Sequence, residues 1–154
     1  MNAVHQPYVD RVFTIELDKK LASNAQKRFA YTKKVHVIQG DSKIVLQELL
    51  KDINEPCLFW LDAHYSGGKT ACGDKSTPIE KEFEIIFGHK NVQQHLLLID
   101  DARCFNGEND YPRLEDVEKS IENKFDDWIL KVENDIIITY RQQTLRPKTI
   151  KCLK

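Results

Sequence analysis

Acidic residues close or directly follow the apolar runs of this 154-residue chain, at Glu16, Asp41, Asp62, Asp100 and Asp101. The runs, at residues 12–17, 35–39, 57–62 and 95–100, have the length and composition of β-strands. The carboxyl ends of parallel strands meet at one edge of an open α/β sheet, where its ligands bind. The sequence therefore predicts an acidic binding site at that edge.

Asp62, Asp100 and Asp101 are the candidates for a metal site. Adjacent aspartates repel each other unless a cation or hydrogen-bond donors lie nearby, and Mg²⁺ prefers carboxylate oxygens. His64 could act as a general base beside such an ion, because an unperturbed histidine titrates near neutral pH. In the alternative arrangement one aspartate caps a turn and Arg103 pairs with the other. The residues alone leave both arrangements open.

The other candidates would bind an organic ligand. Glu16 could accept hydrogen bonds from the hydroxyl groups of a ribose, or it could be a solvated residue or a helix-cap contact. Asp41 could accept from an adenine amino group, or its Gly-Asp-Ser context could simply begin a helix. Tyr65, Phe105 and Tyr111 lie in the two loops at the same edge, where they could line the pocket of a small-molecule substrate or pack the loops on themselves.

Amphipathic segments lie between the strands, and capping residues mark where helices begin. Asp18 and Ser42 are expected to cap the first two helices, and Thr77 with Pro78 marks a third. A fourth helix is expected over about residues 113–125. Strands and helices that alternate in this way predict an α/β fold with a mostly parallel sheet.

Two strands are apolar on both faces, at residues 57–62 and 95–100, so both are expected to be buried on both sides with Trp60 in the core. Residues 128–141 predict an antiparallel hairpin that turns near Asn134 and Asp135. We expect one domain over residues 1–141 and a polar, basic tail or edge segment over residues 142–154.

Composition excludes several classes of protein. Lys and Arg number 23 against 24 Asp and Glu, a formal charge of −1, so no broad nucleic-acid surface is expected. No run approaches the roughly 18 apolar residues of a membrane span, and the N-terminus lacks the apolar core of a signal peptide. The four cysteines form no CxxC pair and are too sparse for a disulfide framework. A cytoplasmic location is expected.

The ordered motifs VFTIELD, VHVIQGDS, CLFWLDAHYSGG and HLLLIDDARCFNGENDYP resemble strands two to five of class I S-adenosylmethionine-dependent methyltransferases. The similar branch is the metal-dependent macrocin- and novobiocin-type sugar O-methyltransferases. The resemblance covers roughly residues 3–141 and implies a Rossmann-like sheet. It implies S-adenosylmethionine contacts at Glu16 and Asp41, and Mg²⁺ held by Asp62, Asp100 and Asp101. His64 stands where that branch has the second acid of an Asp-Gly-Asp motif, the proposed base.

One family motif has no counterpart here. The family's first strand ends in a glycine-rich loop, whereas only 11 residues precede Val12 and the first glycine is Gly40. The resemblance therefore implies an N-terminally truncated domain that lacks the usual first, central strand, and weak or lost cofactor binding. Three arrangements would satisfy the exposed backbone: direct pairing of the two flanking strands, a strand donated by a partner chain, or a homodimer that covers the edge.

Three functions are compatible with these features. The first is S-adenosylmethionine-dependent methyl transfer, to oxygen by ancestry. The second is a non-catalytic binding or interaction module on the same fold. The third is a metal-dependent hydrolase that uses Asp62, His64, Asp100 and Asp101 and needs no glycine loop. The sequence does not identify the methyl acceptor.

Overall fold

A computed structural model describes residues 7, 9–62, 79–142 and 151–153 of the chain. Within these residues the protein is a mixed α/β fold with four α-helices and seven strands. The strands are β1 (Val12–Glu16), β2 (Val35–Gln39), β3 (Cys57–Leu61), β4 (Leu96–Ile99), β5 (Trp128–Glu133), β6 (Ile136–Arg141) and β7 (Lys151–Leu153). The helices are α1 (Lys19–Arg28), α2 (Ser42–Lys51), α3 (Ile79–Phe87) and α4 (Leu114–Glu122).

The strands form one sheet in the order β2-β1-β7-β3-β4-β6-β5. The neighbours from β2 to β4 are parallel, whereas β6 is antiparallel to both β4 and β5. The predicted hairpin is thus confirmed as β5 and β6. Its turn residues Asn134 and Asp135 have φ values of 52° and 65°, a left-handed pair that matches the right-handed twist of the two strands.

The C-terminal strand β7 corrects two expectations. Residues 142–154 were expected to form a tail or an edge segment, yet Lys151–Leu153 lies inside the sheet. Val12 and Phe13 of β1 pair with it on one side, and residues 57–59 of β3 on the other. The second expectation was that the two flanking strands pair directly, take a strand from a partner chain or are covered in a homodimer. Instead, β7 of the same chain lies between β1 and β3 and satisfies backbone groups on both neighbours.

Helix ends follow the capping chemistry of the sequence, with one correction. Asp18 caps α1 by accepting hydrogen bonds from the backbone N–H groups of Lys20 and Leu21, at 2.7 and 2.8 Å. The cap of α2 is Asp41 and not Ser42, since the Asp41 carboxylate accepts from the N–H of Lys43 at 3.0 Å. A carboxylate is also the stronger partner for the positive end of a helix.

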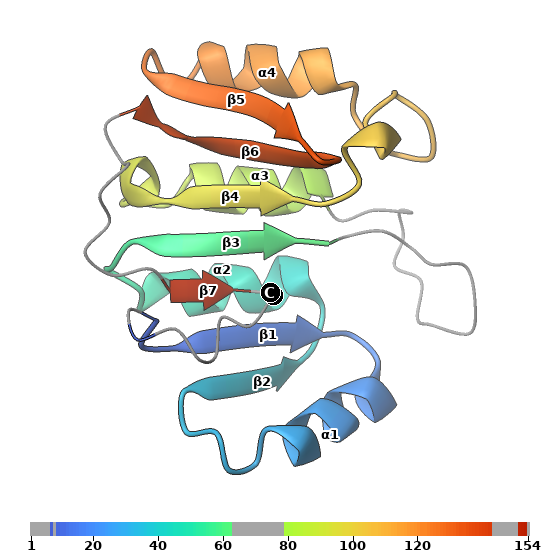
Figure 1. The fold of residues 1–154 in the computed structure, drawn as a ribbon, viewed down its shortest axis with the longest axis vertical. Coiled ribbons are helices and arrows are strands. Elements are labelled where there is room, and N and C mark those ends of the chain that lie inside the picture. The colour runs from blue at the N-terminus through green and yellow to red at the C-terminus, as the bar shows by residue number, and fades with distance from the viewer. Residues whose placement is uncertain (1–6, 8, 63–78, 143–150, 154) are drawn as a thin grey trace.

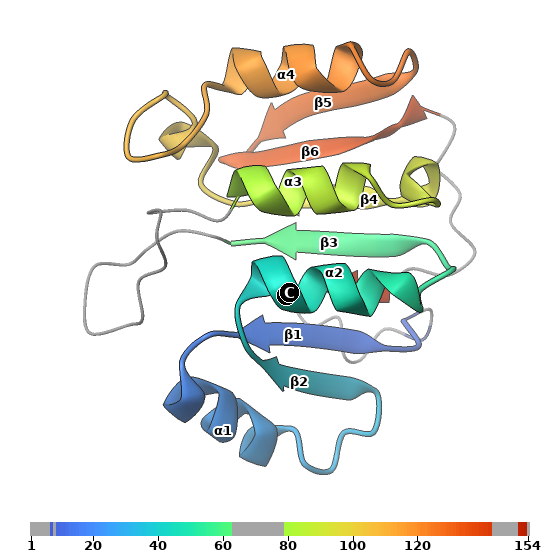
Figure 2. The same ribbon diagram turned by 180° about the vertical axis from the view of Figure 1, so that it is seen from behind.

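The helices and the sheet form two layers over most of the molecule. Helices α2, α3 and α4 lie on one face of the sheet (Figures 1 and 2), and α1 packs against β1 and β2. The core lies between the sheet and helices α2, α3 and α4. Its most buried large side chains include Phe59, Leu97 and Ile137 from the strands and Ile86 and Ile121 from the helices.

The opposite face of the sheet does not match the sequence prediction. In β3, Cys57, Phe59 and Leu61 are buried under the helices, but Leu58 and Trp60 are partly exposed and stand outside the core cluster. The same alternation holds in β4. The expected burial on both sides is therefore wrong for these strands among the described residues.

None of the helices described here combines the length and apolar character that a membrane span needs.

Candidate functional site

The order of the strands changes direction at β7. From β1 the chain moves outward to β2, and from β3 it moves the other way to β4, so β7 marks the switch point of the parallel strands. Their carboxyl ends all point to the same edge, on the right in Figure 1. A crevice outside such ends, at a switch point, is where open α/β sheets bind ligands. Glu16, Asp41, Asp62 and Asp100 each end or follow one of these strands.

Glu16 ends β1, the strand on one side of the switch point. Its carboxylate atom Oε1 accepts a hydrogen bond from the N–H of Asp18 at 2.9 Å, which holds the side chain in the turn before α1. Its backbone carbonyl accepts from the N–H of Gly40 at 3.0 Å, so the ends of β1 and β2 are tied together. The second carboxylate oxygen of Glu16 is not used in these contacts. Glu16 can therefore accept a hydrogen bond from a ligand hydroxyl.

Asp41 follows β2, and its carboxylate already makes contacts within the protein. One carboxylate oxygen caps α2, as described above, and the other lies 3.6 Å from the Nζ of Lys43. Gly40 is needed beside it, because a Cβ at position 40 would lie 2.7 Å from the side chain of Val45. These contacts are the ones expected if Asp41 only begins a helix. Asp41 is half-buried, and each of its carboxylate oxygens can still accept a further hydrogen bond.

Asp62 and Asp100 end the neighbouring strands β3 and β4, as the sequence predicted. The N–H of Asp100 donates to the carbonyl of Leu61 at 2.9 Å, so the two strand ends are adjacent. The Asp62 side chain is exposed, and one Asp100 carboxylate oxygen accepts from the N–H of Asp101 at 3.0 Å. Asp100 thus makes the local turn contact that was the alternative to metal binding.

Asp101 is held by a cation from the protein itself. Its backbone is left-handed, with φ 58°, and the residue is 9% exposed. An Arg103 nitrogen lies 2.6 Å from its carboxylate, and the same guanidinium pairs with Asp135 in the hairpin turn. The N–H of Arg103 also donates to the Asp135 carboxylate at 2.9 Å. Arg103 therefore joins the loop after β4 to the turn between β5 and β6.

These contacts bear on the expected magnesium site. Among the described residues, no group of three His, Cys, Asp or Glu side chains is close enough to hold a metal ion. The charge of Asp101 is met by Arg103, which leaves Asp62 and Asp100 without a third carboxylate of their own. His64 and Tyr65 lie outside the described residues. The described donors do not fit a three-carboxylate metal site.

Phe105 and Tyr111 lie together in the loop after β4. Phe105 is 5% exposed, and the two rings meet edge to face with centroids 5.4 Å apart. The loop closes on itself through an N–H of Leu114 that donates to the Phe105 carbonyl at 2.9 Å. Packing of the loop, the alternative to a substrate pocket, accounts for this pair.

One acidic residue at this edge was missed in the sequence. Glu82, in the first turns of α3, is only 5% exposed, and burial raises the pKa of its carboxyl group, with a smaller opposing effect from a hydrogen bond to Ser42. Asp41 raises the pKa further and Lys43 lowers it. The sequence could have identified Glu82 as buried from its position, because it lies three residues after Ile79 on the buried stripe of an amphipathic helix.

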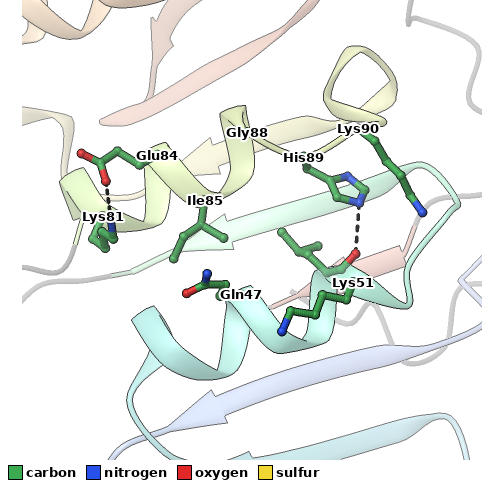
Figure 3. A pocket seen from close by; sticks show the side chains of 9 residues that line it. Gln47, Lys51, Lys81, Glu84, Ile85, Gly88, His89 and Lys90 are labelled. Atoms are coloured by element: carbon green, nitrogen blue, oxygen red, sulfur yellow. Dashed lines mark hydrogen bonds and ion pairs between the residues drawn. The ribbon is translucent and has the colours of Figure 1, made fainter.

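A groove of about 530 Å³ lies between α2 and α3, away from the acidic edge. Figure 3 shows Lys51 on the α2 side and Lys81, His89 and Lys90 on the α3 side. Lys51 pairs with Glu48 and Lys81 with Glu84, at 2.7 and 2.6 Å. None of the acidic candidates of the strand ends lines this groove.

At the amino ends of β3 and β4, the buried His95 and the half-buried His89 form a chain of hydrogen bonds. The N–H of Cys57 donates to Nδ1 of His95 at 3.2 Å, so Nε2 of His95 carries the proton and donates to Nδ1 of His89 at 2.7 Å. Nε2 of His89 then donates to the carbonyls of Leu50 and Ile53, both at 3.1 Å. His95 is fully buried, and burial, followed by the repulsion of His89, lowers its pKa to about 3.

No family model, no curated protein and no solved structure matches this chain.

Proposed function

We propose that the chain is a methyltransferase-like protein that binds the nucleoside part of S-adenosylmethionine at the switch point, beside Glu16. The strand order carries this proposal. Class I methyltransferases have the order 3-2-1-4-5-7-6, and here β2, β1, β3, β4, β6 and β5 take the places of strands 3, 2, 4, 5, 7 and 6. β7 takes the place of strand 1. The acidic strand ends then stand at the positions that the resemblance implies.

The side chains have different roles in this proposal. Glu16 accepts hydrogen bonds from the ribose through its unused oxygen, while Asp18 fixes the side chain. Asp41 lies on the adenine side and holds the start of α2. The cofactor would supply an electrophilic methyl group. No step is assigned to Mg²⁺, because Arg103 already neutralises Asp101.

Titration calorimetry of the full chain with S-adenosylmethionine and S-adenosylhomocysteine tests the proposal. We expect one site with weak affinity, a Kd of about 100 µM, because no glycine-rich loop precedes β1. Glu16→Gln removes the charge-assisted hydrogen bonds and should weaken binding about tenfold, equivalent to about 1.4 kcal/mol. Glu118→Gln, an exposed change on α4, is the matched control and should not alter the Kd. Absence of binding at millimolar ligand, or equal affinity of the Glu16 variant, would contradict the proposal.

A second candidate is a non-catalytic binding module on the same fold. The ion pair between Asp101 and Arg103 favours the binding module, because Arg103 occupies a carboxylate that metal-dependent methyl transfer would need. Formation of S-adenosylhomocysteine from S-adenosylmethionine separates the two candidates. Turnover that Glu16→Gln lowers supports an enzyme, whereas cofactor binding without turnover supports the module.

A further inference from the structure

The face of the sheet opposite the helices carries apolar side chains that are partly exposed. Strands alternate their side chains between two faces, and the residues between the buried ones of β3, β4 and β6 point away from the helices. We call six of them the outer-face patch: Leu58, Trp60, Leu96, Leu98, Ile138 and Tyr140. None of the six belongs to the core cluster or packs against it.

Strand register makes the patch continuous. Leu58 lies opposite Leu96, and Leu96 opposite Tyr140, which forms one row across three strands. Trp60, Leu98 and Ile138 form the next row in the same way. Directly opposed side chains on neighbouring strands are about 5 Å apart, so the rows leave no polar gap. Figure 1 shows no helix over β3, β4 and β6 on this side, among the described residues.

The six residues of the patch carry no charge, and charged residues border it. By the same alternation these are Lys131 and Glu133 on β5, which pair with each other at 2.7 Å, and Asp62 and Asp100 at the carboxyl ends of β3 and β4. Parallel strands are normally covered on both faces, and contiguous apolar surface of this kind marks a contact with another molecule. A flat, apolar partner surface would complement it.

We propose that the outer-face patch is the contact surface of a homodimer in which two copies pack sheet against sheet about a two-fold axis. A two-fold contact places the same patch on both sides, so each copy supplies the flat apolar surface that the other needs. The formal charge of −1 adds little repulsion between copies. This contact differs from a dimer formed by exchange of strands at the β1–β3 gap, which β7 already fills.

The size of the patch sets the strength of the dimer. With strands about 4.8 Å apart, the patch and its neighbours on β5 extend roughly 20 Å across the sheet and about 15 Å along it. Two such faces bury on the order of 1,000 Å² in total, at the low end for specific association. The dimer is therefore weak and depends on concentration, with a Kd in the micromolar range.

Sedimentation velocity of the full chain between about 1 and 200 µM tests this proposal. We expect a reversible shift from monomer to dimer. Leu98→Lys places a charge at the centre of the patch and should raise the dimer Kd at least tenfold. The matched control is Val132→Lys, which puts the same charge on β5 at a residue already 44% exposed on the other face of the sheet, and it should leave the Kd unchanged.

A second pair of variants separates loss of contact from loss of folding. Leu98→Glu should also be monomeric, and an equimolar mixture of the Lys and Glu variants should form a heterodimer, because Leu98 lies near the proposed axis. Far-ultraviolet circular dichroism confirms that each variant is folded. A wild-type chain that stays monomeric at all concentrations would overturn the proposal and leave the patch to a different partner. A dimer that survives Leu98→Lys would also overturn it and point to strand exchange.

Discussion

The two ends of the parallel strands use polar residues in opposite ways. At the amino ends, the His89–His95 chain has a partner for every ring nitrogen, from the Cys57 N–H to the carbonyls that close α2. At the carboxyl ends, Glu16 and Asp62 keep oxygens that no described contact uses, and Glu82 carries a carboxyl group into a buried position. A satisfied network stabilises a fold, whereas spare acceptors at a switch point are what a ligand needs.

The largest effect should come from the amino end. His95→Gln breaks the chain of hydrogen bonds and leaves the Cys57 N–H or His89 without its present partner inside the core. We expect a loss of about 2 to 3 kcal/mol in the free energy of unfolding at pH 8, measured by urea denaturation. His36→Gln, an exposed change on β2, should cost much less. Equal losses from both variants would show that the network adds no stability.

The same residue predicts how stability depends on pH. An unfolded histidine takes up a proton near pH 6.5, whereas the folded pKa of His95 is about 3, so protons favour the unfolded state between these values. The contribution of His95 is complete above pH 6.5 and is lost as the pH falls towards 3, by up to about 1.4 kcal/mol per pH unit. His95→Gln should remove this part of the slope. An unchanged slope would contradict the assigned neutral state of His95.

Glu82 at the carboxyl end should show the opposite sign. Because burial raises its pKa above 4.5, the folded state holds a proton that the unfolded state has released. The stability that Glu82 contributes is therefore present below pH 4.5 and is lost as the pH rises through the raised pKa. Glu82→Gln should stabilise the protein at pH 8, on the order of 1 kcal/mol, and should give no gain at pH 4.

Urea denaturation at the two pH values measures this difference, with Glu118→Gln as the exposed control. A Glu82 variant that is less stable than the parent at pH 8 would show that the carboxylate is well solvated or paired there. Glu82 would then resemble the fully hydrogen-bonded histidines at the amino ends of the parallel strands, and the contrast between the two ends of the strands would be smaller.

Much of this arrangement follows from local patterns in the sequence. The alternation of strands and helices, the cap at Asp18, and the adjacency of Asp62 and Asp100 depend on residues close together in the chain or on the general rule for parallel strands. The cap of α2 was expected one residue late, at Ser42, because both Asp41 and Ser42 are capping residue types. The position of β7 does not, because Lys-Cys-Leu is too short to show a period and is a strand only between β1 and β3.

The remaining misses have the same cause. His89 and His95 are six residues apart in a loop, and only the fold brings their rings together over the end of α2. Trp60 was expected in the core because its strand is apolar on both faces, but composition cannot tell a second layer of helices from a surface that meets another chain. The outer-face patch is therefore where the sequence pattern and the structure of a single chain disagree most.

The smallest effect should come from Arg103, whose guanidinium pairs with both Asp101 and Asp135 at the acidic edge. Arg103→Gln should cost about 0.2 to 1 kcal/mol, since its side chain is 63% exposed and water screens the pairs. Asp135→Asn should cost a similar amount, and the double variant less than the sum, because both changes remove the same bridge. Additive losses in this double-mutant cycle would mean that Arg103 and Asp135 act separately. The guanidinium would then be only a counter-ion for Asp101 and not the tie between the loop after β4 and the hairpin.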